Sequence, residues 1–255
     1  MENYRVNRAV GKGSFGKVYL ATHVRENRSY VLKVIKLKGI PPKEREACRN
    51  EVMLMQRLQH PNIVAYKDSF FANGRDNLCI VMTYCDGGDL GQRIADAKSH
   101  LFKEDQIMHW FVQTALAIHY MHEQKVLHRD IKAQNIFMLG NGRLVLGDLG
   151  ISKVLDGTAQ FAQTQIGTPY YMSPELFKNK PYNHKSDVWA LGCVLYELCA
   201  LVHPFDAANI QGLSQKIMKG AVRALMRWHA RSRALRRLFP PPAGATLPPP
   251  ALPSH

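Results

Sequence analysis

The sequence predicts an α+β protein with two lobes of unequal size, a small β-rich lobe followed by a larger α-helical one. Up to Tyr84, short apolar segments alternate with turn residues, which is typical of strands. Beyond this point apolar residues recur at helical spacing, most clearly over residues 104–123. Gly87 and Gly88 mark the change, so we place the first lobe and its hinge at residues 1–85 and the second lobe at residues 86–220.

Composition narrows the class of protein. A chain of 255 residues can bury a large core, and its net charge of +14 is uneven, with +6 in residues 221–255 and +8 in the other 220. A basic surface suits anionic nucleotides or acidic partners but identifies neither, and no nucleic-acid partner is expected. Five cysteines without CxxC spacing argue against a disulfide framework or a zinc site. The N-terminus lacks a signal-peptide core and the most apolar run, residues 188–202, is too short to span a bilayer, so we expect a cytoplasmic or nuclear protein.

A glycine-rich turn lies between two short apolar segments near the N-terminus. Residues 10–18 read VGKGSFGKV, and glycines allow backbone N–H groups to approach phosphate oxygens closely. A GxGxxG pattern alone is weak evidence, because dinucleotide-binding folds share it. Here strand-like residues 18–22 follow the glycines instead of a helix. We therefore expect a loop that joins two antiparallel strands and folds over a nucleotide.

Two charged residues stand among apolar neighbours in the first lobe. Lys33 lies in the predicted strand 30–35, where a solvent-facing lysine on an edge strand is the alternative. A helix predicted from Lys43 to Leu58 carries Glu51 on its apolar face, which comprises Ala47, Leu54, Met55 and Leu58. A buried charge is costly unless it is paired. Lys33 is the natural partner of Glu51, and the pair would hold Lys33 against the phosphates of a nucleotide.

The remaining elements follow from periodicity and turn residues. Residues 62–66 and 78–84 read as two further strands, with Asn73 and Gly74 in the connection between them. A helix is expected to begin near Ser186 and to continue to about Leu201. The core-facing positions of the helix 104–123 are Ile107, Phe111, Ala115, Ile118 and Met121.

A polar loop at residues 128–135, HRDIKAQN, runs directly into the apolar residues 136–139. It supplies a carboxylate (Asp130), an ammonium (Lys132) and a carboxamide (Asn135) within a few residues. Such a loop can hold a base, a phosphate-neutralising cation and a metal ligand. Taken alone, it could also be an ordinary charged surface loop.

A second acidic residue, Asp148, ends the apolar segment 144–146. Thirteen residues separate it from Asn135, with a Gly-Asn-Gly turn at 140–142 between them. This spacing predicts a hairpin that brings Asn135 and Asp148 side by side. Two oxygen ligands, completed by phosphate oxygens and water, would form a Mg²⁺ site. The following residues, 151–175, lack periodicity, and a long loop in a compact domain is usually functional.

The order of these signatures resembles the eukaryotic protein kinases. The chain presents a glycine loop, a strand Lys, a helix Glu, and then HRDIKAQN, DLG, SPE and DVW. HRDIKAQN with Lys132, and GTPYY with Thr168, resemble serine/threonine kinases. The segments DLG, HPNIV, CDGGDL, GTPYYMSPEL, KSDVWALGC and LYELC resemble the NIMA-related (Nek) kinases. The likeness covers residue 4 to about residue 220 and implies the two-lobe kinase fold.

The resemblance implies transfer of the ATP γ-phosphoryl group, with Mg²⁺, to Ser or Thr hydroxyls of protein substrates. Asp130 would orient or accept the proton of the attacking hydroxyl, and Lys132 would contact the transferring group. Lys33, positioned by Glu51, would neutralise the α- and β-phosphates. The metal ligands would be Asn135 and Asp148.

The resemblance also implies a nucleotide site between the lobes. The adenine would lie between valines above and an aromatic ring below, with backbone groups of the hinge at its edge and an acid at the ribose. The valines above the adenine would be Val10, Val18 and Val31, and the ring below it would be Phe137. The hinge groups would be those of Thr83 and Cys85, behind Met82. The acid at the ribose would be Asp89. The loop over the phosphates comprises Gly11, Lys12, Gly13, Ser14, Phe15 and Gly16.

Arg129, next to Asp130, suggests a regulated site. A phosphate placed on Thr164 by an upstream kinase or regulatory partner could pair with Arg129 and order the loop. Thr168 is expected to shape the substrate site. The resemblance makes cytoskeletal, centrosomal, ciliary or cell-cycle roles plausible without a residue that shows them.

Residues 221–255 depart from the kinase pattern, with six Arg and no acid. We expect a disordered Arg/Pro-rich tail and an incomplete C-lobe, as in a truncated or alternatively spliced form. Two alternatives remain: a basic helix over 221–239 that binds an acidic surface, a membrane or calmodulin, and polyproline ligands from Pro240.

An incomplete C-lobe has two expected consequences. It would expose the apolar face of the helix that begins near Asp187 and leave Glu175 without an Arg partner. The alternative function is therefore a catalytically impaired isoform that binds nucleotide or partners. A nucleic-acid-binding protein rests on charge alone and ranks third.

Overall fold

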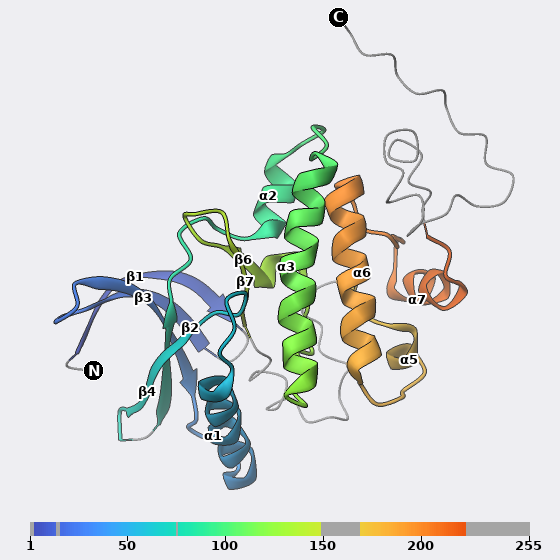
Figure 1. Cartoon of the computed structure of the whole chain (residues 1–255). Coiled ribbons are helices and arrows are strands. Elements are labelled where there is room, and N and C mark those ends of the chain that lie inside the picture. Colours follow the sequence, from blue (N-terminus) through green and yellow to red (C-terminus); the bar gives the residue numbers. More distant parts are fainter. Residues whose placement is uncertain (1–2, 14–15, 75, 149–168, 223–255) are drawn as a thin grey trace, which may run out of the picture.

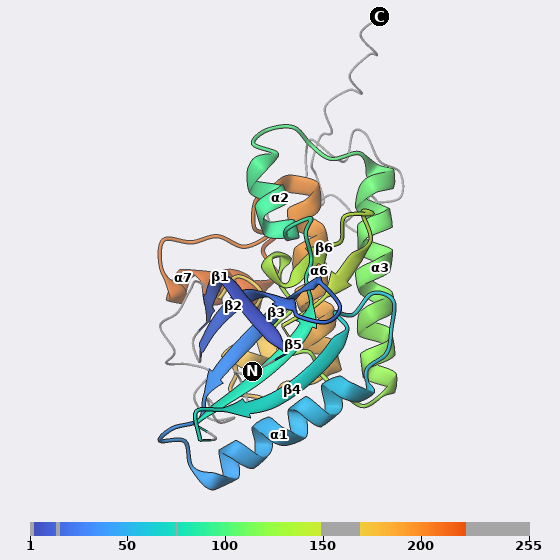
Figure 2. The same cartoon turned by 90° about the vertical axis from the view of Figure 1, so that its left-hand side faces the viewer.

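A computed structural model describes residues 3–13, 16–74, 76–148 and 169–222, which form two lobes (Figure 1). The N-lobe is a five-stranded antiparallel sheet with strand order β1-β2-β3-β5-β4. Its elements are β1 (Tyr4–Gly13), β2 (Gly16–His23), β3 (Arg28–Lys36), α1 (Pro42–Arg57), β4 (Tyr66–Ala72) and β5 (Asn77–Thr83). Helix α1 runs along one face of the sheet beside β4 (Figure 2).

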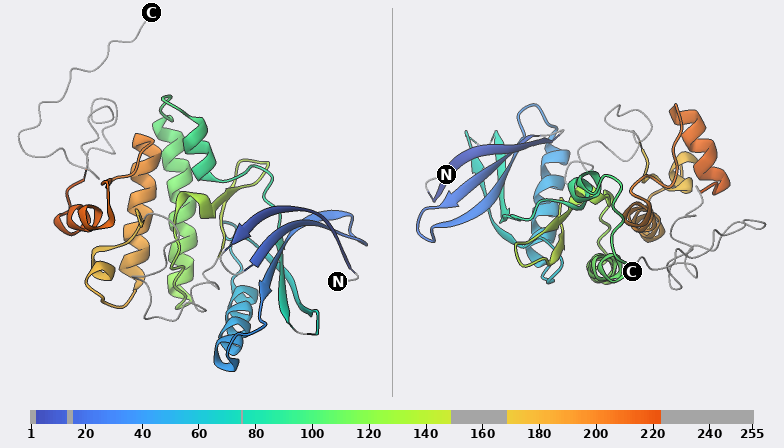
Figure 3. Two further views of the ribbon diagram at one scale, coloured as in Figure 1. Left: turned by 180° about the vertical axis from the view of Figure 1, so that it is seen from behind. Right: turned by 90° about the horizontal axis from the view of Figure 1, so that it is seen from above.

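The C-lobe is helical and contains one small hairpin. Helices α3 and α6 lie side by side at its centre, as all views show (Figures 1 and 3). Its elements are α2 (Leu90–Asp96), α3 (Glu104–Glu123), a 3₁₀ turn (Ala133–Asn135), β6 (Ile136–Met138), β7 (Leu144–Leu146), α5 (Pro174–Phe177), α6 (His184–Ala200) and α7 (Ile210–Lys219). The predicted two-lobe α+β fold is confirmed. Among the described residues, no helix combines the length and the apolar character that crossing a bilayer requires.

The glycine-rich turn joins β1 and β2 as predicted, with Gly13 opposite Gly16 in the antiparallel register. Close packing also requires glycine at position 16, since a Cβ there would overlap the carbonyl oxygen of Val34. Ser14 and Phe15 lie outside the described residues, as does the side chain of Lys12.

The expected strand at residues 62–66 is wrong, because β4 begins only at Tyr66. The apolar residues before it pair with the C-lobe instead. The Val64 amide donates to the Leu146 carbonyl at 2.9 Å, and the Leu146 amide donates to the Asn62 carbonyl at 2.8 Å. The buried Asn62 side chain adds a hydrogen bond to the Leu144 carbonyl at 2.8 Å. This segment therefore attaches the N-lobe to β7.

The buried face of helix α1 is narrower than predicted. Met55 and Leu58 are buried, but Leu54 is 41% exposed. Cys48, Val52 and Met55 form the buried stripe at spacings of four and three residues, and Leu54 lies beside it. The same core cluster continues into the C-lobe through residues such as Ile118 of α3, so the two lobes share one continuous core.

Helix α6 is covered, contrary to the expectation that its apolar face would be exposed. Eleven of its residues are buried, although Val188 is 50% exposed. The chain turns at Leu201, which caps the helix with a φ of 59°, and folds back over it. Phe205, with Leu213 and Ile217 of α7, packs against Cys193. Part of the covering thus comes from residues 203–217 themselves.

Truncation of Leu213 tests this covering layer. Leu213→Ala should lower the free energy of unfolding by about 2–5 kcal/mol, because it removes a fully buried side chain between α7 and α6. Ile210→Ala is the matched control in the same helix, since Ile210 is 56% exposed, and should change stability by no more than about 0.5 kcal/mol. Urea unfolding measures both. Equal effects of the two variants would contradict the packing described.

Candidate active site

The loop 128–135 gathers its polar groups around Asp130. Lys132 Nζ donates to Asp130 Oδ2 at 2.9 Å. Asn135 Nδ2 donates to the same oxygen at 2.8 Å and to the Asp130 carbonyl at 2.7 Å. The carboxylate is thus held in one orientation by an ammonium and an amide. Because both hydrogens of the Asn135 amide are engaged, its oxygen is the atom oriented to ligate a cation.

His128 braces this loop from within the core. It is 1% exposed, and burial lowers its pKa despite the opposing influence of Asp187 and Asp130, so the ring is neutral. Its Nδ1 accepts from the Asp130 amide at 3.2 Å, which leaves the ring proton on Nε2. Nε2 then donates to the Gly147 carbonyl at 3.1 Å. One imidazole therefore ties the Asp130 backbone to the residue that precedes Asp148.

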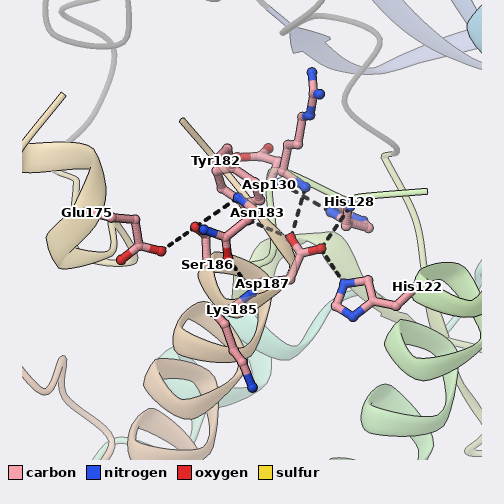
Figure 4. Close-up of polar contacts among 10 residues, drawn as sticks. His122, His128, Asp130, Glu175, Tyr182, Asn183, Lys185, Ser186 and Asp187 are labelled. Atoms are coloured by element: carbon pink, nitrogen blue, oxygen red, sulfur yellow. Dashed lines mark hydrogen bonds and ion pairs between the residues drawn. The ribbon is translucent and has the colours of Figure 1, made fainter. Parts of the chain in front are cut away.

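A second carboxylate, Asp187 at the start of α6, positions the loop from below (Figure 4). It is fully buried and accepts from the amides of His128 at 3.0 Å and Arg129 at 3.1 Å. It also accepts from His122 Nε2 at 2.8 Å and from the Tyr182 hydroxyl. Arg129 has a φ of 67°, a costly backbone conformation for a residue with a side chain. The hydrogen bond from the Arg129 amide to Asp187 helps to hold this conformation.

Next to this cluster, Glu175 accepts a hydrogen bond from the Ser186 hydroxyl (Figure 4). Burial raises the pKa of Glu175, but hydrogen bonds, chiefly that from Ser186, outweigh it and hold the pKa below its usual value. Burial and the Asp187 charge raise the pKa of Tyr182, so its hydroxyl remains a donor. The SPE segment is thereby anchored to the first turn of α6 by Ser186.

The hairpin β6–β7 delivers Asp148 to the same place. The Gly147 amide donates to the Asn135 carbonyl at 3.0 Å, so the predicted closeness of Asn135 and the Asp148 segment is confirmed at the backbone. Lys33 of β3 forms an ion pair with Asp148 across the gap between the lobes. Glu51 lies in α1, as predicted, but its side chain is outside the described part, so its pairing with Lys33 stays a prediction.

The residues predicted to surround the adenine come from both lobes. Val31 of β3 lies opposite Met82 of β5, and Gly11 lies opposite Val18 in the β1–β2 hairpin. Phe137, half-buried on β6, packs against Gly147 and pairs with Asp89. The three valines thus lie in the N-lobe sheet and Phe137 in the C-lobe hairpin, and Val10 on β1 is 40% exposed. Their roles as roof and floor of an adenine site stay predictions.

The hinge residues are held by backbone contacts. Thr83 ends β5, and its amide donates to the Ala65 carbonyl at 3.0 Å. The Cys85 thiol lies 3.9 Å from the Thr83 carbonyl, and burial raises its pKa to about 11. Asp89 caps helix α2 by accepting from the Gln92 amide at 2.9 Å. A ribose hydroxyl would therefore share the Asp89 carboxylate with this cap.

The donor set fits a Mg²⁺–nucleotide. Asn135 offers an amide oxygen, and the Asp148 side chain is 40% exposed, so both can supply hard oxygen ligands. Lys33 Nζ, already beside Asp148, provides the cation that phosphate oxygens require. These three residues would hold the metal and the phosphates.

Comparison with known proteins agrees with this geometry. The family model described as protein kinase domain matches residues 4–240. The chain belongs to the protein kinase family. The loop 128–135 and the β6–β7 hairpin described above lie within the matched range.

The curated relatives are NIMA-related kinases, as the sequence motifs predicted. The chain is 53% identical to mouse serine/threonine-protein kinase Nek1 over 87% of its length, which is 18% of that protein. It is 53% identical to human Nek5 over 85% of its length, 30% of that protein. It is 50% identical to mouse Nek5 over 94% of its length, 37% of that protein. The chain thus spans less than half of the length of these relatives.

Sequence reasoning missed the groups that support the loop. Neither His122 of α3 nor Tyr182 is among the residues predicted from the sequence. Both reach Asp187, from 65 and 5 residues away respectively. Thr164 and Thr168, and the tail beyond residue 222, lie outside the described residues.

Replacement of Asp187 by Asn should damage the loop without changing its size. All four recorded partners of Asp187 present hydrogens, so the new NH₂ group would face a donor. We expect a loss of about 3 kcal/mol or more in unfolding free energy. Asp76→Asn is the control, since that side chain is 46% exposed, and it should unfold like the unaltered chain. Urea titration followed by circular dichroism measures both, and equal midpoints would contradict the role of Asp187.

Proposed function

We propose that this chain is a Mg²⁺- and ATP-dependent protein kinase that phosphorylates Ser and Thr hydroxyls of protein substrates. The observation that carries the proposal is the fixed carboxylate of Asp130, hydrogen-bonded by Lys132 and Asn135. The same loop accepts from the Gly147 amide, next to Asp148, which pairs with Lys33 of the other lobe. The membership of the kinase family and the names of the relatives support it.

The residues of this chain divide the task. Asp130, with its orientation fixed, accepts or orients the proton of an incoming Ser or Thr hydroxyl. Lys132, beside it, is placed to stabilise negative charge that develops on the transferring group. Mg²⁺–ATP, when bound, supplies the γ-phosphoryl group and neutralises its charge. Since little covalent chemistry falls to the protein, positioning of these side chains accounts for most of its contribution.

We further propose regulation at Thr164 by an upstream kinase or regulatory partner. Arg129 lies next to Asp130, and its backbone is held by Asp187. A phosphate on Thr164 would supply an anion for the Arg129 guanidinium and order the preceding loop. The proposals of a cytoplasmic location, at the cytoskeleton, centrosome or cilium, and of a non-kinase tail after residue 220 rest on the sequence motifs and composition.

Phosphorylation of casein by the purified chain tests the activity. Asp130→Asn should reduce kcat by at least about 100-fold, because the carboxylate that handles the hydroxyl proton is lost. Asp148→Ala should abolish transfer through loss of a metal ligand. Asp76→Asn is the exposed acidic control and should retain full activity. Equal turnover by the unaltered chain and Asp148→Ala would refute the proposal.

A rise in melting temperature with Mg²⁺–ATP, but no turnover, would instead favour the catalytically impaired isoform. Lys33→Met tests the nucleotide site that both functions share. It should remove the nucleotide-dependent rise because it removes the phosphate-facing cation.

Replacement of Thr164 by Ala tests the regulatory proposal. We expect Thr164→Ala to lower the activity of protein isolated from eukaryotic cells to the level of phosphatase-treated chain. Thr158→Ala, six residues earlier in the sequence, is the matched control and should behave like the unaltered chain. Phosphopeptide mapping identifies the modified residue, and unchanged activity of Thr164→Ala would reject the role of this site.

A further inference from the structure

A second buried carboxylate in α6, Glu197, lies outside the groups assigned to catalysis. It is 4% exposed in an otherwise apolar part of the helix. Burial, with the Glu197 charge as the second cause, raises the pKa of the nearby Cys193 to about 12. An ionised carboxylate in such surroundings requires partners. It has two, the Tyr171 hydroxyl on Oε2 and the His203 imidazole on Oε1.

Tyr171 connects Glu197 to the catalytic loop. Its hydroxyl accepts from the Ala133 amide at 3.4 Å and donates to Glu197. Burial, followed by the Glu197 charge, raises the pKa of Tyr171, so the hydroxyl keeps the proton that it donates. Ala133 is 1% exposed and lies directly after Lys132, in the 3₁₀ turn that ends with Asn135. The contact is therefore adjacent to both groups that orient Asp130.

The direction of this hydrogen-bond chain depends on the ionisation of Glu197. With Glu197 ionised, every bond runs one way, from the Ala133 amide to Tyr171 and from Tyr171 to Glu197. A protonated Glu197 could donate to the Tyr171 oxygen. The Tyr171 hydroxyl hydrogen would then have to point away from Glu197 and toward the Ala133 N–H. That orientation would weaken the hydrogen bond that the Tyr171 oxygen accepts from the Ala133 amide. A group that stabilises the negative charge of Glu197 therefore also stabilises the hydrogen bond between Tyr171 and the Ala133 amide.

His203 is the group placed to do this. The chain reverses at Leu201 and brings His203 Nδ1 back against Glu197 Oε1, a contact that is an ion pair when the ring is protonated. The ring is stacked on Tyr170, with centroids 3.8 Å apart and planes at 17°. Its side chain is 31% exposed and lines a pocket of about 330 Å³ with Asp206 and Lys216. Stacking fixes the ring while its outer edge reaches solvent.

We propose that His203 is a positioning residue for the catalytic loop, acting through Glu197 and Tyr171 on the Ala133 amide. The expected effect of His203 on turnover rests on the proposed kinase activity. The structural consequence of His203, protection of the loop 130–136, holds whether or not the chain turns over.

Hydrogen–deuterium exchange of peptides that contain residues 130–136 tests the connection directly. His203→Ala should speed exchange in this segment and leave exchange in β5 (Asn77–Thr83) unchanged. In a Glu197→Gln background the buried charge is gone, so His203→Ala should add little. His119→Ala removes a His–Glu pair on the exposed side of α3 and should change nothing at residues 130–136.

Kinetics supply the second readout. His203→Ala should lower kcat roughly tenfold with the KM for ATP unchanged, because the loop rather than the nucleotide site is affected. Should His203→Ala fail to fold, Tyr171→Phe keeps the ring, removes the hydroxyl and should give the same faster exchange.

Three results would overturn the proposal: unchanged exchange in His203→Ala, an equal increase in the Glu197→Gln background, or unchanged exchange in Tyr171→Phe. A wild-type chain without turnover would refute the proposed activity instead, and the exchange comparison would remain decisive for His203.

Discussion

The carboxylate of Asp187 is the interaction on which the rest of the site depends. It is fully buried at the first turn of α6 and is surrounded by donors from α3, from the catalytic loop and from the segment before α6. The capping box formed by Asn183 and Ser186 fixes the helix end from which it projects. Since two of its bonds go to backbone amides, it sets the path of the loop whatever side chains follow. The orientation of Asp130 is a result of that path.

Helix α6 thereby acts on the catalytic loop at two places. Asp187, in its first turn, holds residues 128–129, and Glu197, nearly three turns later, reaches Ala133 through Tyr171. Buried carboxylates are costly, and both are compensated by donors and by a His. Residues 203–217 complete this arrangement, because they cover α6 and bring His203 to its place.

The sequence predicted what local patterns encode and missed what distant residues decide. The glycine turn, the helix 104–123 and the hairpin that leads to Asp148 were all confirmed. The segment 62–65 looked like a strand because an apolar run encodes burial, and only the fold shows that β7 is its partner. The pairs His122–Asp187 and Tyr171–Glu197 join residues 65 and 26 positions apart, for which a single sequence carries no signal. Leu54 was predicted to face the core but is exposed, because α1 buries only the narrow stripe of Cys48, Val52 and Met55.

The small β6–β7 hairpin links two distant stretches of the chain. Its first strand accepts a hydrogen bond from the Gly87 amide at the Met138 carbonyl, over 2.9 Å, and its second strand pairs with the segment from Asn62 to Val64. Asn135 directly precedes the first strand, and Asp148 follows the second strand after Gly147. The spacing between the two expected metal ligands is therefore set by backbone pairing, which substitutions of the side chains on the hairpin leave in place.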